Sequence, residues 1–127
     1  MKFFAGEYTM ARISLESLND IDGFIAAALV DSDSGLSLAA IGNGIDLELA
    51  AAGNTEVIRA KRKTVKVLNL QDQIEDVLIT LGKQYHIIRP LETNDNLFLY
   101  VVLDRSKSNL AMARHELRGF EKGLDFS

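Results

Sequence analysis

Two runs in this chain are apolar at every position, and they constrain its fold more than any other feature. They occupy residues 24–30 and 97–103. A strand with one buried face alternates apolar and polar side chains, whereas a short run without alternation is typical of a strand covered on both faces. We therefore expect a sheet that carries helices on both of its faces.

The remaining strand-like segments predict a five-stranded sheet. Residues 31–35 are turn formers that include Gly35, and the apolar residues 36–41 follow them, which predicts a β-hairpin with residues 24–30. Later segments are joined by connections short enough for antiparallel neighbours. These segments lie at about residues 74–81, 84–91 and 97–103.

Three helices are predicted from apolar residues at spacings of three and four. The first is short and can be capped by Ser14. The longest spans about residues 45–68, with Asn69 as its exit because asparagine tolerates the left-handed cap conformation. Ser106 or Ser108 can cap the last helix. The element order is thus helix, two strands, long helix, three strands, helix.

This order predicts one α+β domain. A length of 127 residues fits a single domain. We expect a five-stranded antiparallel sheet with the long central helix on one face and the two terminal helices on the other. The domain would span residues 14–127, and residues 1–13, which show no clean period, form an extension of uncertain structure.

Composition excludes several function classes. With 14 basic and 18 acidic residues the net charge is −4, so the chain lacks the broad basic field that nucleic-acid binding needs. It has no cysteine, which excludes thiolate metal sites and fits a reducing compartment. No apolar stretch is long enough for a membrane helix, and the first residues are too short a run for a signal peptide. We expect a cytoplasmic protein that neither binds nucleic acid nor inserts into a membrane.

No catalytic or metal-binding template is complete. His115 begins a two-histidine zinc motif, but Gly119 stands where the second histidine belongs. Residues 42–44 lack the third glycine of a dinucleotide loop. Residues 31–35 resemble the opening of a calcium loop, but Gly35 stands at its fifth ligand position and Gly42 at its bidentate position. His86 lies among apolar residues of a predicted strand, where a hydrogen-bonded structural role is expected. We therefore expect no enzymatic activity, no catalytic residue, no cofactor and no metal.

The second half of the long helix is strongly basic. Arg59, Arg62, Lys63 and Lys66 recur at spacings that place them on one helix face. These charges can complement the negative end of the helix and keep its surface hydrated. They can also form a docking stripe for an acidic protein partner. The sequence leaves both interpretations open.

A second stripe on the same helix consists mostly of small side chains. Glycine costs about 1 kcal/mol relative to alanine inside a helix, so Gly53 suggests that another backbone approaches closely. The stripe comprises Ala50, Gly53, Val57, Ala60, Thr64 and Val67.

The strand-like segment at residues 74–81 also suggests an interface. Val77, Ile79 and Leu81 share one face, and Leu78 on the other face is apolar too. Such a strand at a sheet edge is a template for pairing with another chain. Together with the small-residue stripe, it predicts self-association through sheet extension and helix contact.

Three blocks of sequence resemble the roadblock family of dynein light chains, including its bacterial MglB-like branch. They are residues 27–38, 50–56 and 97–105, and the resemblance covers roughly residues 14–122. It implies a non-enzymatic module with a roadblock/longin-like sandwich, which pairs by joining strands of two chains into one sheet. Bacterial and archaeal members are similar in binding Ras-like small GTPases through their paired long helices. Eukaryotic members act as dynein subunits or signalling scaffolds.

Carried onto this chain, the resemblance implies a homodimer that regulates a Ras-like small GTPase. An alternative is a dimeric structural adaptor for motor or signalling complexes, whose binding does not depend on nucleotide. A small-molecule sensor would need polar groups converging in an apolar pocket, and the sequence identifies no such group. The resemblance places the pairing strand at residues 75–81. The implied dimer interface comprises Ala50, Gly53, Glu75, Val77, Leu78, Ile79 and Leu81, and the implied partner-binding residues are Glu56, Arg59, Arg62 and Lys63.

Overall fold

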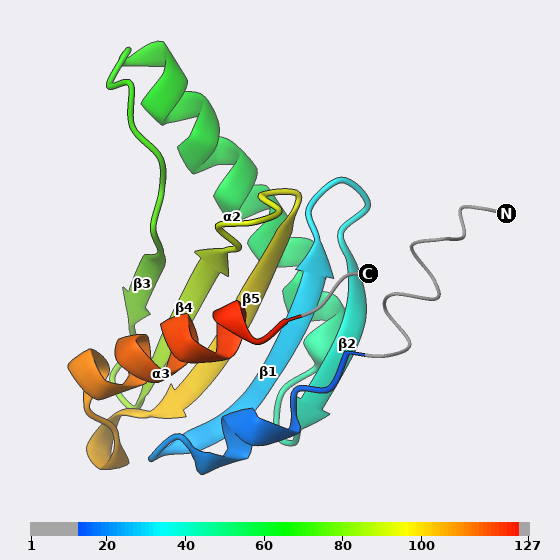
Figure 1. Cartoon of the computed structure of the whole chain (residues 1–127), viewed down its shortest axis with the longest axis vertical. Coiled ribbons are helices and arrows are strands. Elements are labelled where there is room, and N and C mark those ends of the chain that lie inside the picture. The colour runs from blue at the N-terminus through cyan, green and yellow to red at the C-terminus, as the bar shows by residue number, and fades with distance from the viewer. Residues whose placement is uncertain (1–12, 125–127) are drawn as a thin grey trace, which may run out of the picture.

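The two uninterrupted apolar runs form neighbouring strands inside a five-stranded sheet (Figure 1). The computed structural model describes residues 13–124, so the extension expected at residues 1–13 lies, but for its last residue, outside the described residues. All neighbouring strands are antiparallel, in the order β2-β1-β5-β4-β3, which confirms the predicted sheet. The strands are β1 (Phe24–Asp31), β2 (Leu36–Gly42), β3 (Val77–Thr80), β4 (Gln84–Pro90) and β5 (Leu97–Asp104).

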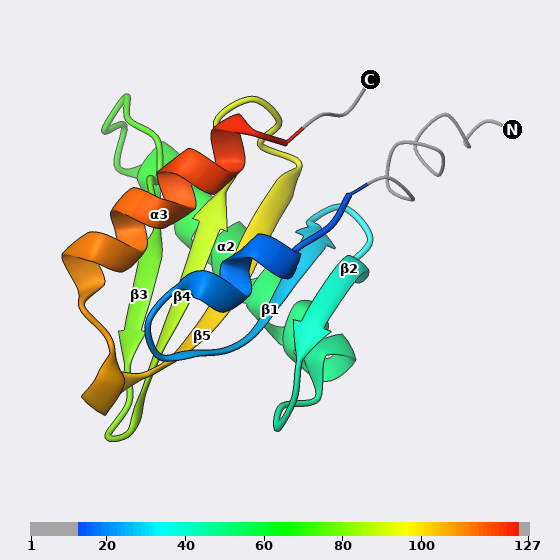
Figure 2. The same cartoon turned by 60° about the horizontal axis from the view of Figure 1, so that its bottom comes forward.

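Helices lie on both faces of the sheet. The helix α2 (Leu47–Val67) packs on one face, and the 3-10 helix η1 (Glu16–Asp20) and the helix α3 (Leu110–Lys122) lie on the other (Figures 1 and 2). A short 3-10 turn, η2 (Arg105–Lys107), connects β5 to α3.

Successive residues of the inner strands point into two different cores. Ala28 and Val30 of β1 pack on the α2 side, whereas Ala27 and Leu29 pack against the core under η1 and α3. All four are fully buried. Burial on both faces is the physical reason that neither run contains polar alternation.

The ends of α2 follow the local rules of helix capping. Asp46 caps its start by accepting a hydrogen bond from the amide of Leu49 at 3.1 Å. The helix ends at Val67, and Asn69 has a φ of 53°. This left-handed residue confirms the predicted exit. Among residues 13–124, no helix combines the length and the apolar character that a membrane span needs.

The two terminal helices begin differently from the prediction. The first expected helix is a 3-10 helix of five residues, beside which the Ser14 hydroxyl accepts the amide of Glu16 at 3.2 Å. The last helix is capped by Asn109 and not by Ser106 or Ser108. The Ser108 hydroxyl is engaged elsewhere, because it donates to the carbonyl of Asp104 at 2.6 Å.

The strand expected at residues 74–81 is shorter than predicted. It forms a ladder only over Val77–Thr80, so Glu75 and Leu81 lie outside β3. Glu75 and Asp76, just before the ladder, form ion pairs with arginines of β4 and α3. Pairs of this kind join residues far apart in the sequence and leave no local pattern.

Candidate partner interface

The outer edge of β3 is open. Within the described part of the chain, β3 pairs with β4 on one side and is the last strand of the sheet on the other. Val77 and Ile79 face the α2 side and are half-buried, whereas Leu78 faces the core under α3. A strand edge that carries unpaired backbone groups is a template for another strand.

The side of α2 that faces away from the sheet carries small and apolar residues. The residues buried against the sheet are Ala51, Thr55 and Ile58. An added Cβ at Gly53 would meet nothing within 4 Å, so the helix backbone is accessible there. Leu49 and Val67 are 70% and 74% exposed. We call the set at this helical spacing the outer stripe: Leu49, Gly53, Val57, Ala60, Thr64 and Val67. Five of them are exposed, and Val57 lies at the edge of the stripe, where it is partly buried.

An incompletely buried apolar surface connects α2 to β3. Ala50 and Val57 on α2 and Ile74, Val77 and Ile79 beside or within β3 all pack at the margin of the same core. Each is only partly buried. A second polypeptide that covered this surface would remove further apolar area from water, which is the main favourable term in most protein association.

A hydrogen-bonded histidine lies next to this surface. His86 is opposite Ile79 in the β3–β4 register. Its Nε2 is 2.9 Å from Gln84 Oε1, and its Nδ1 is 3.0 Å from the hydroxyl of Tyr100. Because a carbonyl oxygen can only accept, Nε2 carries the proton of the neutral ring. Burial lowers the pKa of His86 and raises that of Tyr100, so both side chains are neutral at pH 7.

The arginines expected to bind a partner are engaged within the chain. Arg59 donates to the carbonyl of Asp33 at 2.7 Å. Arg62 donates to the Ser32 hydroxyl at 3.4 Å and to the carbonyl of Asp95. These contacts tie α2 to the β1–β2 turn and to the loop between β4 and β5.

The other two residues of the expected partner-binding set remain exposed. Glu56 forms an ion pair with Arg59 at 3.6 Å on the helix surface. Lys63 makes no ion pair within residues 13–124. Of the four residues, Glu56 and Lys63 thus have the fewest contacts with other elements of the chain, and the expected role of all four in partner binding stays a prediction.

Removing the guanidinium of Arg62 should destabilise the chain. The substitution Arg62→Gln removes hydrogen bonds from a charged donor, and bonds of this type contribute about 1.5–3 kcal/mol. We expect the free energy of unfolding to fall by about that amount in urea titration. The matched substitution Lys63→Gln removes an exposed charge and should stay within about 0.5 kcal/mol of the parent. Equal stability of the two variants would contradict this assignment.

A cluster of buried ion pairs is the main feature that sequence reasoning missed. Arg89 on β4 is only 3% exposed, and its Nε donates to Glu121 Oε1 at 3.0 Å. Its Nη1 lies 3.6 Å from Asp76 and 3.9 Å from Glu75. We call the whole set the ionic cluster: Glu75, Asp76, Arg89, Arg114, Arg118 and Glu121.

Two sequence signals for this cluster were available. Arg89 directly follows the apolar pair Ile87 and Ile88, and Glu121 lies one helical turn after Leu117 on the buried side of α3. A charged side chain at either position needs a buried partner. The sequence indicates that Arg89 and Glu121 need oppositely charged partners, but it does not show which residues these are.

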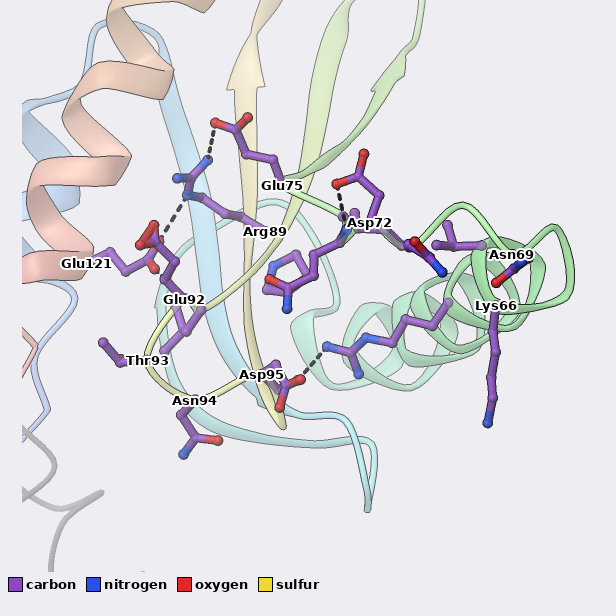
Figure 3. A pocket seen from close by; sticks show the side chains of 17 residues that line it. Lys66, Asn69, Asp72, Glu75, Arg89, Glu92, Thr93, Asn94, Asp95 and Glu121 are labelled. Carbon is purple, nitrogen blue, oxygen red and sulfur yellow. Dashed lines mark hydrogen bonds and ion pairs between the residues drawn. The ribbon is translucent and has the colours of Figure 1, made fainter.

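A cleft of about 840 Å³ borders the ionic cluster, between the end of α2 and the loop at residues 92–95 (Figure 3). In Figure 3, Arg89 points toward Glu75 and Glu121 and away from Lys66. Its guanidinium is thus neutralised by the chain's own carboxylates. Within the described residues, no three side chains of the metal-ligating types form a group that could hold an ion.

The fold is that of solved roadblock-type structures. The gliding protein MglB of Thermus thermophilus superposes with a TM-score of 0.75 at 16% identity, over 94% of this chain and 88% of that one. MglB of Myxococcus xanthus superposes with a TM-score of 0.70 at 15% identity, over 95% of this chain and 85% of that one. The Roadblock/LC7 domain from Streptomyces avermitilis superposes with a TM-score of 0.67 at 16% identity, over 94% of this chain and 90% of that one. No family model matches the sequence, and no curated protein matches it. These similarities confirm the predicted roadblock, MglB-like fold.

Proposed function

We propose that this chain is a non-enzymatic cytoplasmic protein that pairs with a second copy and binds a Ras-like small GTPase through the paired α2 helices. The observation that carries the proposal is the adjacency of the open β3 edge, the outer stripe and the half-buried apolar surface between them. The roadblock-type fold supports it, because the resemblance described above implies this mode of pairing and this class of partner.

The spacing of the outer stripe favours an antiparallel pair of α2 helices. In an antiparallel register centred between residues 58 and 59, Gly53 of one copy faces Thr64 of the other, and Val57 faces Ala60. Leu49 then faces Leu68, which is 61% exposed at the end of the helix. Small residues therefore meet in the middle and large exposed leucines meet at the ends, which allows close helix packing.

The distribution of charge along α2 also favours an antiparallel pair of helices. The first half of α2 carries Glu48 and Glu56, whereas its basic side chains all lie in the second half, from Arg59 to Lys66. An antiparallel pair places each acidic half beside the basic half of the other copy. A parallel pair would bring the two basic halves together, and this repulsion disfavours it.

The proposed mechanism for the GTPase is surface complementarity. A rigid pair of helices that fits one arrangement of the GTPase switch loops stabilises that arrangement and shifts its population. Lys63 and Glu56 lie beside the outer stripe on the exposed surface of α2, where such a partner would dock. The chain contributes a binding surface and no reacting group.

Binding should depend on the nucleotide. We expect the purified chain to bind a Ras-like small GTPase of the same organism at least about tenfold more tightly in one nucleotide state than in the other, a difference of about 1.4 kcal/mol. Titration calorimetry with GDP and with a non-hydrolysable GTP analogue measures this difference. Lys63→Glu should weaken binding, and Lys122→Glu on α3 should leave it unchanged. Equal affinity in both states would favour the structural adaptor, and absence of binding would reject the regulator.

A further inference from the structure

We infer that Asp76 is a positioning residue, which fixes the start of β3 so that its open edge is presented for pairing. The inference deepens the proposed function and rests on it for its biological meaning. It assigns α3, on the opposite face of the sheet, a role in building the interface.

The strand β3 has few other constraints. It is only four residues long and pairs with a single neighbour. The segment between α2 and β3, residues 68–76, contains no helix or strand. An edge strand of this kind is expected among the first elements to open locally. A contact directly before the first residue of β3 therefore has a large influence on the position of the strand.

Asp76 provides that contact directly before Val77. Its side chain is 8% exposed, and both of its carboxylate oxygens accept hydrogen bonds from Arg114 on α3, each at 2.9 Å. The hydrogen bonds to Asp76 raise the pKa of Arg114. A bidentate arginine–carboxylate pair fixes orientation as well as distance.

Arg89 links Asp76 to the interior of the sheet. The Nη1 of Arg89 is buried and has no hydrogen-bond partner within the described residues, and the Asp76 carboxylate is 3.6 Å away. The charge of Arg89 is thus compensated by Asp76 on one side and by Glu121 on the other. Glu121 also accepts the amide of Glu92 at 2.6 Å, so one connected set of contacts holds β4, α3 and the residue before β3.

The neighbouring acidic residue provides a matched comparison. Glu75 is 69% exposed on its side chain, and Arg118, its partner on α3, is 45% exposed at 3.6 Å. Exposed pairs of this kind contribute little to stability. Arg118→Gln therefore removes one arginine from the same helix and the same cluster without disturbing Asp76.

Hydrogen exchange separates a positioning role from a general structural one. In Asp76→Asn we expect the amides of β3 to exchange at least tenfold faster, with the amides of β1 and β5 within twofold of the parent. Self-association, measured by sedimentation, should weaken about fivefold. In Arg118→Gln, exchange and self-association should both stay within twofold of the parent.

Two results would overturn the inference: unchanged exchange in β3 of Asp76→Asn, or equal acceleration in β1, β3 and β5. If Asp76→Asn does not fold, Arg114→Lys keeps the charge but loses the bidentate geometry, and the same selective acceleration of β3 is expected. A monomeric parent chain would reject the proposed pairing, while the exchange experiment would still decide the role of Asp76.

Discussion

The substitution Ile79→Lys should abolish self-association while the chain remains folded. Ile79 is half-buried on the α2 side of the open edge strand, so in a single copy a lysine there can extend its charge to solvent. In the proposed pair the same position is covered by the second copy, and an unpaired buried charge costs at least about 3 kcal/mol. We expect the dissociation constant, measured by sedimentation equilibrium, to rise at least about 100-fold.

The matched substitution one residue earlier, at Leu78, should act mainly on the stability of the single copy. Leu78 points to the other face of the sheet and packs against the core under α3. Leu78→Lys should lower the free energy of unfolding by about 1–2 kcal/mol, because it removes the apolar contacts that the partly buried Leu78 makes with that core in a single copy as well. Thermal and urea unfolding measure this loss. An Ile79→Lys variant that associates like the parent would place the interface elsewhere.

The sheet and its layers could be predicted because burial on both faces leaves a local signature. Residues 24–30 and 97–103 contain no polar alternation, and they form β1 and β5, whose side chains enter two cores. Likewise, Asn69 follows the end of α2 in the left-handed conformation, which asparagine tolerates better than most residues. Such features are encoded within a few consecutive residues.

The ionic cluster and the role of the arginines on α2 could not be predicted in the same way. Asp76 is paired with Arg114, which is 38 positions later, and Arg62 contacts the carbonyl of Asp95, which is 33 positions later. Helical periodicity places Arg59 and Arg62 on one face. It contains no information on which loop carbonyls the fold brings to that face.

Helical periodicity also identified the small-residue stripe, but it did not show whether the stripe faces the sheet or the solvent. A stripe of glycine, alanine and threonine fits close packing against the chain's own sheet as well as against another chain. The structure distinguishes the two, because the residues buried against the sheet are Ala51, Thr55 and Ile58, and Gly53 faces open space. Which surface covers Gly53 is a question of association, and mutation can answer it.

Gly53→Gln should stabilise the single copy and weaken its self-association. Gly53 lies inside α2 and is not in the left-handed region, so glutamine gains about 0.7 kcal/mol of helix propensity there. In the proposed antiparallel pair, the added side chain meets Thr64 of the second helix. Overpacking of this kind costs about 2 kcal/mol, equivalent to an approximately 30-fold rise in the dissociation constant.

Gly119→Gln is the control, because Gly119 is also an exposed glycine inside a helix with open space around it, on α3. It should gain the same stability in urea unfolding and associate like the parent. The two variants thus share the helix-propensity term and differ only in the face that they alter. Equal dissociation constants for both would exclude the outer stripe from the interface, whereas a selective loss in Gly53→Gln would assign the α2 surface to pairing.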